Sequence, residues 1–432
     1  MQFVDGALRV QCYFPDENNS EPSSLVSNLW GGIAIRHLSG ITEDNQEIVL
    51  EGQILLTNVD LPITADSEAI TIALIATEML IVPKEVSHPL QTLRFGITNF
   101  EFEGNIRREQ KTETSYKLDM GILAANLPFG EIRVERLLNY DEAVANLRAI
   151  QSIEPTCEIS LELSGHDIQW AKDVADNLCT ILSLAKGTKI VWIYLDGYDA
   201  EGIKRLTLHK YAIARPYSGA SASVVDSIHP SDVKELIENG YQRFTQLKGE
   251  YRLGNVIDSY LESKRPHSYL ESRGLAAIQS MELLAGQYAE KHNLVYVIDR
   301  NKFSDKLSEI GSAVSEALQE AFGEDSANSL CGEDNEKLMI LNRRTLRQVL
   351  KRLFQDFGIE VSRQKLNELI ETRNALVHRG SFNTNDRVKE FYRIISIMDT
   401  LLLKMLGYEG YILDCEQKWA RIKLQAKANP SR

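Results

Sequence analysis

The stretch Glu371-Thr-Arg-Asn-Ala-Leu-Val-His-Arg-Gly380 decides how the rest of the chain is interpreted. On a helix that begins near residue 361, apolar side chains recur at three- and four-residue spacing and form one stripe: Leu366, Leu369, Ile370 and Val377. Arg373 falls on this stripe, although burying an unpaired charge is strongly unfavourable. Gly380 is typical of a helix C-cap, which places His378 in the last turn.

A polar stripe follows beside the apolar one at the same spacing: Asn367, Glu371, Asn374 and His378. Arg373, Asn374 and His378 therefore gather near one helix end. Arginine offers a planar fork for phosphate oxygens, histidine exchanges a proton near neutral pH, and asparagine can orient either group. These residue types predict a site that handles phosphate, with Arg373, Asn374 and His378 as its candidate catalytic residues.

The sequence Arg373-Asn374-x-x-x-His378 resembles the Arg-polar-x(3–5)-His signature of HEPN domains, and Arg-Asn-Ala-Leu-Val-His-Arg-Gly is most similar to the ApeA-like branch of that family. The resemblance implies a helical bundle, a homodimer that brings two motifs together, and metal-independent cleavage of RNA. It also implies a role in anti-phage defence or a stress response, with the N-terminal half as a sensor or regulatory region.

An alternative interpretation of the motif is that Arg373 is a buried residue paired with a carboxylate and that His378 lies on the surface. Glu282 is a candidate partner because it shares a helical stripe with apolar residues: Leu275, Ile278 and Ala285. We expect Glu282 to support Arg373 through an ion pair. The alternative is that Glu282 pairs with another residue or lies at an exposed helix crossing.

A basic set precedes the motif on a helix that we predict over residues 342–357. Four of its cations are candidate substrate-binding residues for RNA: Arg343, Arg344, Arg347 and Lys351. With Arg352 they place five cations within ten residues, opposite an apolar stripe. A solvated charged face is the alternative explanation for such a run.

Composition narrows the classes of function. The 432 residues carry a net charge of −13, all of it in residues 1–220, which contain 18 Lys and Arg against 31 Asp and Glu. The second half is neutral, so it does not repel a polyanion. Phosphate-binding loops, dinucleotide fingerprints and zinc-protease motifs are absent from the sequence, so we expect no cofactor and no metal. Five cysteines without a C-x-x-C spacing, and no apparent signal peptide or membrane span, predict a cytoplasmic protein.

The sequence predicts an α+β multidomain chain, with a β-rich antiparallel N-terminal half and an all-α, HEPN-like bundle after it. Residues 1–135 have the strand patterns of a sandwich or barrel-like domain: 7–14, 33–37, 47–56, 70–81, 92–103 and 116–123. Residues 136–220 predict a small α+β region packed on that domain. A boundary of small polar residues at 217–223 precedes the bundle, residues 224–425, in which 323–336 is expected to be a loop.

Two classes of function follow from these patterns. The first is a HEPN-type endoribonuclease that binds RNA, forms a homodimer through its helical half, receives a phage or cellular trigger at its N-terminal half, and has no membrane partner. His378 would act as acid and base, Arg373 would stabilise charge on the phosphate, and Asn374 would orient the phosphate or His378. The second is a non-catalytic helical dimerisation or partner-binding protein, whose β domain binds a ligand or a protein.

Overall fold

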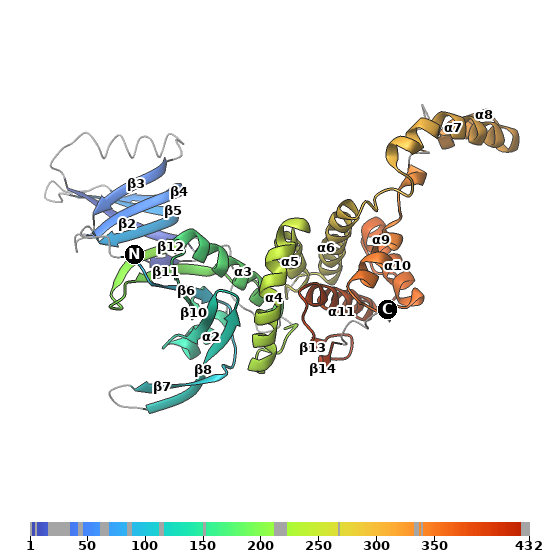
Figure 1. The fold of residues 1–432 in the computed structure, drawn as a ribbon. Coiled ribbons are helices and arrows are strands. Elements are labelled where there is room, and N and C mark those ends of the chain that lie inside the picture. The colour runs from blue at the N-terminus through green and yellow to red at the C-terminus, as the bar shows by residue number, and fades with distance from the viewer. Residues whose placement is uncertain are drawn as a thin grey trace.

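The computed structural model of this chain describes residues 2–4, 7–15, 35–41, 46–60, 69–83, 89–111, 116–149, 153–210, 223–266, 268–331, 337 and 340–424. All but the last residue of the predicted boundary at 217–223 lies outside these ranges, as does the tail 425–432. The predicted division is confirmed at the level of fold class: the N-terminal half is an antiparallel sheet and the C-terminal half is helical (Figure 1).

Within the described residues, the N-terminal half contains one sheet of twelve strands. They are β1 (Gln2–Val4), β2 (Ala7–Pro15), β3 (Ile35–Ile41), β4 (Gln46–Asp60), β5 (Ala69–Pro83), β6 (Thr92–Thr98), β7 (Ile106–Lys111), β8 (Tyr116–Leu127), β9 (Gly130–Arg136), β10 (Pro155–Glu162), β11 (Trp192–Tyr198) and β12 (Lys204–Lys210). Their order is β1-β2-β5-β12-β11-β6-β10-β9-β8-β7, and β4 joins β3 to β5. Strands β10, β11 and β12, which follow residue 135, therefore lie in the same sheet as the earlier strands and pair with β5 and β6.

Strand β6 shows how the sequence pattern becomes the core of this sheet. Its alternating residues Leu93, Phe95 and Ile97 are fully buried, and they pair in register with the apolar residues of β10. The strand was predicted to continue to residue 103, but it ends at Thr98. The reason is local, because Asn99 has a φ of 63° and turns the chain out of the extended conformation.

Two helices accompany the sheet, α2 (Tyr140–Arg148) and α3 (Ile168–Lys186). The backbone N–H of Trp170 donates to Asp167, which caps the N-terminus of α3. Gly187 ends α3 in the left-handed conformation, with a φ of 70°. Helix α3 packs on β6 and β11 on one side and on helices of the C-terminal half on another, and most of its length is buried.

The helical half comprises α4 (Pro230–Glu250), α5 (Leu253–Ser263), α6 (Leu270–Lys291), α7 (Arg300–Phe322), α8 (Glu324–Cys331), α9 (Leu346–Asp356), α10 (Arg363–Arg379) and α11 (Arg387–Met405). A hairpin of β13 (Tyr411–Asp414) and β14 (Ala420–Lys423) follows. Helix α6 is central, because α5, α9, α10 and α11 all pack on it. A buried ion pair between Lys264 and Asp399, at 2.9 Å, fixes α5 to α11, and the Tyr260 hydroxyl also donates to Asp399.

The two halves share one continuous hydrophobic core. Helix α3 packs on both α4 and α5. The backbone N–H groups of Val224 and Val225 donate to the carbonyl of Ala185 at the end of α3, at 2.8 and 3.0 Å. Lys248 of α4 also donates to Asn177 Oδ1 of α3, at 2.8 Å. The sheet and the bundle are therefore anchored to each other close to where the chain passes between them.

Helices α7 and α8 pack on each other and extend away from the other helices (Figure 1). The expected loop at residues 323–336 is therefore partly wrong, because residues 324–331 form α8 after a turn at Gly323, whose φ is 87°. In the part of the chain that the structure describes, no helix is both long and apolar enough to cross a bilayer.

Candidate functional site

The motif lies at the end of α10, as the sequence predicted. The Ser362 hydroxyl accepts a hydrogen bond from the backbone N–H of Lys365 and caps the N-terminus of the helix. Gly380 forms the C-cap with a φ of 66°, and its N–H donates to the carbonyl of Leu376. His378 consequently lies in the last turn of α10.

The buried face of α10 differs from the predicted apolar stripe. It comprises Leu366, Leu369, Thr372, Ala375 and Leu376. The prediction that Val377 lies on the core face is wrong, since this side chain is 39% exposed. Thr372 occupies a core position instead, because its hydroxyl donates to the carboxylate of Glu390 at 2.7 Å. Arg373 and Val377 therefore share a half-exposed side of the helix.

The expected ion pair between Arg373 and Glu282 is present. Arg373 Nε lies 2.6 Å from Glu282 Oε1, on α6. One further N–H of Arg373, on Nη1, donates to Asn374 Oδ1 at 3.0 Å. The Arg373 and Glu282 side chains are 26% and 31% exposed, so the pair is half-buried rather than deeply buried. Glu282 and Asn374 together hold the guanidinium, and Nη2 forms no hydrogen bond with the described residues.

His378 is exposed and, among the described residues, forms no hydrogen bond, ion pair or ring contact. It is five residues beyond Arg373, which corresponds to about 140° around the helix and about 7.5 Å along it. A single helix therefore presents the imidazole and the guanidinium on different sides. The two side chains are near each other but do not converge on one point within one protomer.

Glu390 fixes the segment that follows the motif. Its carboxylate lies in the first turn of α11 and is 5% exposed. It accepts hydrogen bonds from the Thr372 hydroxyl and from the backbone N–H groups of Asn383 and Thr384. Burial opposes ionisation of Glu390, but these hydrogen bonds outweigh it and lower its pKa. Glu390 therefore connects the last turns of α10 to the start of α11.

A close approach to α6 holds the same segment from the other side. A Cβ added at Gly274 would lie 2.7 Å from Phe382 Cζ and 3.1 Å from Leu376 Cδ1. Phe382 is buried and directly follows the cap at residues 380–381. A side chain at position 274 would force Phe382 to shift, so this close contact helps to define the position of the end of α10 on the bundle.

The predicted basic helix begins later than expected. Helix α9 starts at Leu346, where Thr345 and Gln348 form a capping box, so Arg343 and Arg344 are not on it. Arg343 instead forms an isolated β-bridge with Tyr296, and Arg344 Nε donates to the carbonyl of Tyr296 at 3.2 Å. Arg347 and Lys351 lie on α9 four residues apart. Arg352 is the member of the set that pairs with a carboxylate, Asp356, at 3.2 Å.

Apart from Glu282, sequence reasoning missed the residues that position the motif. Thr372 and Glu390 are eighteen residues apart, and Gly274 is more than a hundred residues from its contacts, so no local pattern joins them. It also missed a polar cluster at the end of α6. There the Tyr288 hydroxyl donates to Asp356, and His292 lies 3.1 Å from the hydroxyl of Tyr251.

Comparison with protein-family models, curated proteins and solved structures finds no match to this chain.

Proposed function

We propose that the chain is a HEPN-type, metal-independent endoribonuclease whose site is built from Arg373, Asn374 and His378. One observation carries this proposal: the Arg373 guanidinium is oriented by Glu282 and Asn374 on a half-exposed face, beside an exposed histidine at the same helix end. An arginine that served only to fill the core would be expected in a more deeply buried position. The arrangement leaves Nη2 of Arg373 for an oxygen of a polyanion.

The chemistry would be transfer of the RNA phosphate to the neighbouring ribose. The 2′-oxygen forms a bond to phosphorus, the bond from phosphorus to the 5′-oxygen breaks, and a cyclic phosphodiester and a 5′-hydroxyl result. His378 would take the 2′-hydroxyl proton or supply the proton to the 5′-oxygen. Arg373 would stabilise the negative charge that accumulates on the phosphorane, and Asn374 would hold Arg373 in place.

We further propose that the active form is a homodimer through the helical half. Because Arg373 and His378 point to different sides of α10, one protomer does not aim both at one phosphate. A two-fold axis beside α10 would bring Arg373 of one protomer to His378 of its partner. Val377, exposed between them, would then be covered by the second copy. Cytoplasmic location, a defence role and a trigger bound by the N-terminal half belong to this proposal as well.

A non-catalytic partner-binding protein is the second candidate, and one observation favours it. Arg373 is paired with a carboxylate and His378 is exposed without a contact in the described chain, as a purely structural motif would have it. Cleavage of a labelled single-stranded RNA by purified His378→Ala separates the two. The ribonuclease proposal predicts loss of cleavage with normal folding, and it predicts that the neighbouring exposed variant Arg379→Ala retains most activity. Equal cleavage by wild type and His378→Ala would overturn it.

A further inference from the structure

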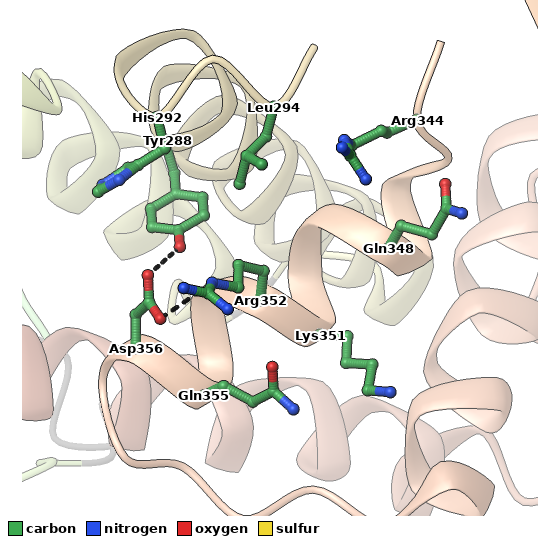
Figure 2. Close-up of a pocket in the computed structure, with 9 residues that line it drawn as sticks. All are labelled: Tyr288, His292, Leu294, Arg344, Gln348, Lys351, Arg352, Gln355 and Asp356. Atoms are coloured by element: carbon green, nitrogen blue, oxygen red, sulfur yellow. Dashed lines mark hydrogen bonds and ion pairs between the residues drawn. The ribbon is translucent and has the colours of Figure 1, made fainter. Parts of the chain in front are cut away.

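A pocket of about 450 Å³ lies between the end of α6 and one face of α9. Figure 2 shows Tyr288 and His292 on one side of it, with Lys351, Arg352 and Asp356 on the other. The volume is within the range of small-molecule sites. Glu282, the partner of Arg373, precedes Tyr288 by six residues on α6, so the pocket lies about 9 Å further along α6 than this ion pair.

The charges that line this pocket do not balance. Three cations, Arg344, Lys351 and Arg352, face one carboxylate, Asp356, so two positive charges remain. Both oxygens of Asp356 are already engaged, one by the Tyr288 hydroxyl and the other by Arg352 Nε. Burial, followed by the hydrogen bond to Asp356, raises the pKa of Tyr288, so this hydroxyl remains a donor. Asp356 is therefore not available to neutralise Arg344 or Lys351.

Arg344 and Lys351 are left without an anionic partner in the described part of the chain. Arg344 uses Nε for the carbonyl of Tyr296, which keeps both Nη groups for another acceptor. Lys351 is exposed and forms no hydrogen bond or ion pair with the described residues. Two like charges beside one concave surface repel each other, and a bound anion would remove this repulsion.

We propose that this pocket binds a phosphomonoester, the dianionic phosphate group of a nucleoside monophosphate or of a phosphorylated RNA end. A phosphomonoester carries a charge of about −1.5 to −2 at neutral pH, which matches the two uncompensated cations. A phosphodiester inside an RNA strand carries one negative charge and would neutralise only half of the excess. Arg344 supplies the bidentate fork and Lys351 the point charge, while Arg352 is held in place by Asp356.

The attached nucleoside would meet the exposed ring of His292, because Tyr288 is buried behind it. The ring centroids of His292 and Tyr288 are 4.4 Å apart, and the Tyr251 hydroxyl orients His292 at 3.1 Å. This edge of the pocket is aromatic, whereas the opposite edge is cationic, so a ligand with a flat base and one phosphate would be accommodated. The inference needs no cleavage of RNA, and it stands or fails separately from the proposed ribonuclease activity.

Isothermal titration calorimetry with AMP and adenosine tests the inference on the full-length protein. AMP is expected to bind and adenosine is not, because the phosphate supplies the interaction. Arg344→Gln and Lys351→Gln are each expected to weaken AMP binding about tenfold or more, since each removes a charge-assisted contact. Lys302→Gln, which removes one exposed cation from α7, is the matched control and should bind AMP as the wild type does.

A second arm separates the two sources of the phosphate. Short RNAs that differ only in a 5′-phosphate or a 5′-hydroxyl are titrated into His378→Ala, which the proposed function predicts to leave RNA intact. Preference for the 5′-phosphorylated RNA, lost in His378→Ala proteins that also carry Lys351→Gln, supports the pocket and identifies an RNA end as a ligand. The inference is overturned if AMP and 5′-phosphorylated RNA both fail to bind. It is also overturned if Arg344→Gln and Lys351→Gln bind as tightly as the control.

Discussion

Two glycines of α6 provide a sharp test of how the end of α10 is positioned. Gly274 and Gly286 lie on the same helix, and alanine is favoured over glycine in a helix interior by about 1 kcal/mol. At Gly286 nothing lies within 4 Å of the added Cβ, so Gly286→Ala should stabilise the protein by about that amount. At Gly274 the new Cβ would lie 2.7 Å from the ring of Phe382, and overpacking of this kind costs about 1–3 kcal/mol.

The two substitutions should therefore change stability in opposite directions. Taking about 2 kcal/mol for the clash, Gly274→Ala loses about 1 kcal/mol net, and the two variants differ by about 2 kcal/mol. Urea unfolding followed by the helical circular dichroism signal measures this as a shift in midpoint at constant slope. Since Phe382 adjoins the motif, Gly274→Ala should also lower RNA cleavage, whereas Gly286→Ala should not. Equal stabilisation by both substitutions would refute the close approach of α6 to the segment after α10.

Three further predictions concern the motif and its supports. In a double-mutant cycle, Glu282→Gln and Arg373→Gln should show a coupling free energy of about 1–2 kcal/mol in unfolding, because a half-buried ion pair lies between the exposed and the buried cases. The exposed pair Lys306–Glu309 is the control and should give about 0.5 kcal/mol or less. Equal coupling energies for the two pairs would contradict the geometry. The pKa of Glu390 is lowered in the folded protein, so the stability that its ionised form contributes is complete above the unfolded pKa of about 4.3 and is lost as the pH falls through the folded pKa. The difference in unfolding free energy between wild type and Glu390→Gln, measured with urea across pH, should be constant near neutrality and shrink below about pH 4. A difference that widens on acidification would be inconsistent with this role. Cleavage should persist in EDTA, because the proposed steps use only His378 and Arg373; activity removed by chelation and restored by a divalent ion would argue against that chemistry.

The local features of the motif and its ion pair with Glu282 were predictable from the sequence, whereas the supporting contacts of Thr372 and Gly274 were not. Ser362, Gly380 and the 3/4 spacing define α10, because caps and periodicity are encoded within a few residues. The Glu282–Arg373 pair followed from two charges placed on apolar stripes, although it joins residues ninety-one positions apart. Val377 was misplaced because the sequence does not show that Thr372 has a buried carboxylate partner on the next helix.

Other errors had a signal that could have been used. Thr345-Leu-Arg-Gln348 has the spacing of a capping box, which would have started α9 at Leu346 and removed Arg343 and Arg344 from the helix. The order of the sheet had no such signal. Strand β12 joins β5 to β11, and pairing between strands more than a hundred residues apart depends on tertiary packing and not on local propensity.

A mixing experiment tests most directly whether RNA is cleaved at a site shared by two protomers. Arg373→Gln and His378→Ala are purified separately, shown to be folded and inactive, and then mixed in equal amounts under conditions that allow exchange. Random pairing makes about half of the dimers mixed, and each mixed dimer has one site with both native residues. We predict recovery of about a quarter of wild-type cleavage in the mixture. No recovery despite proven subunit exchange, or cleavage by a wild-type chain that light scattering shows to be monomeric, would contradict the shared site.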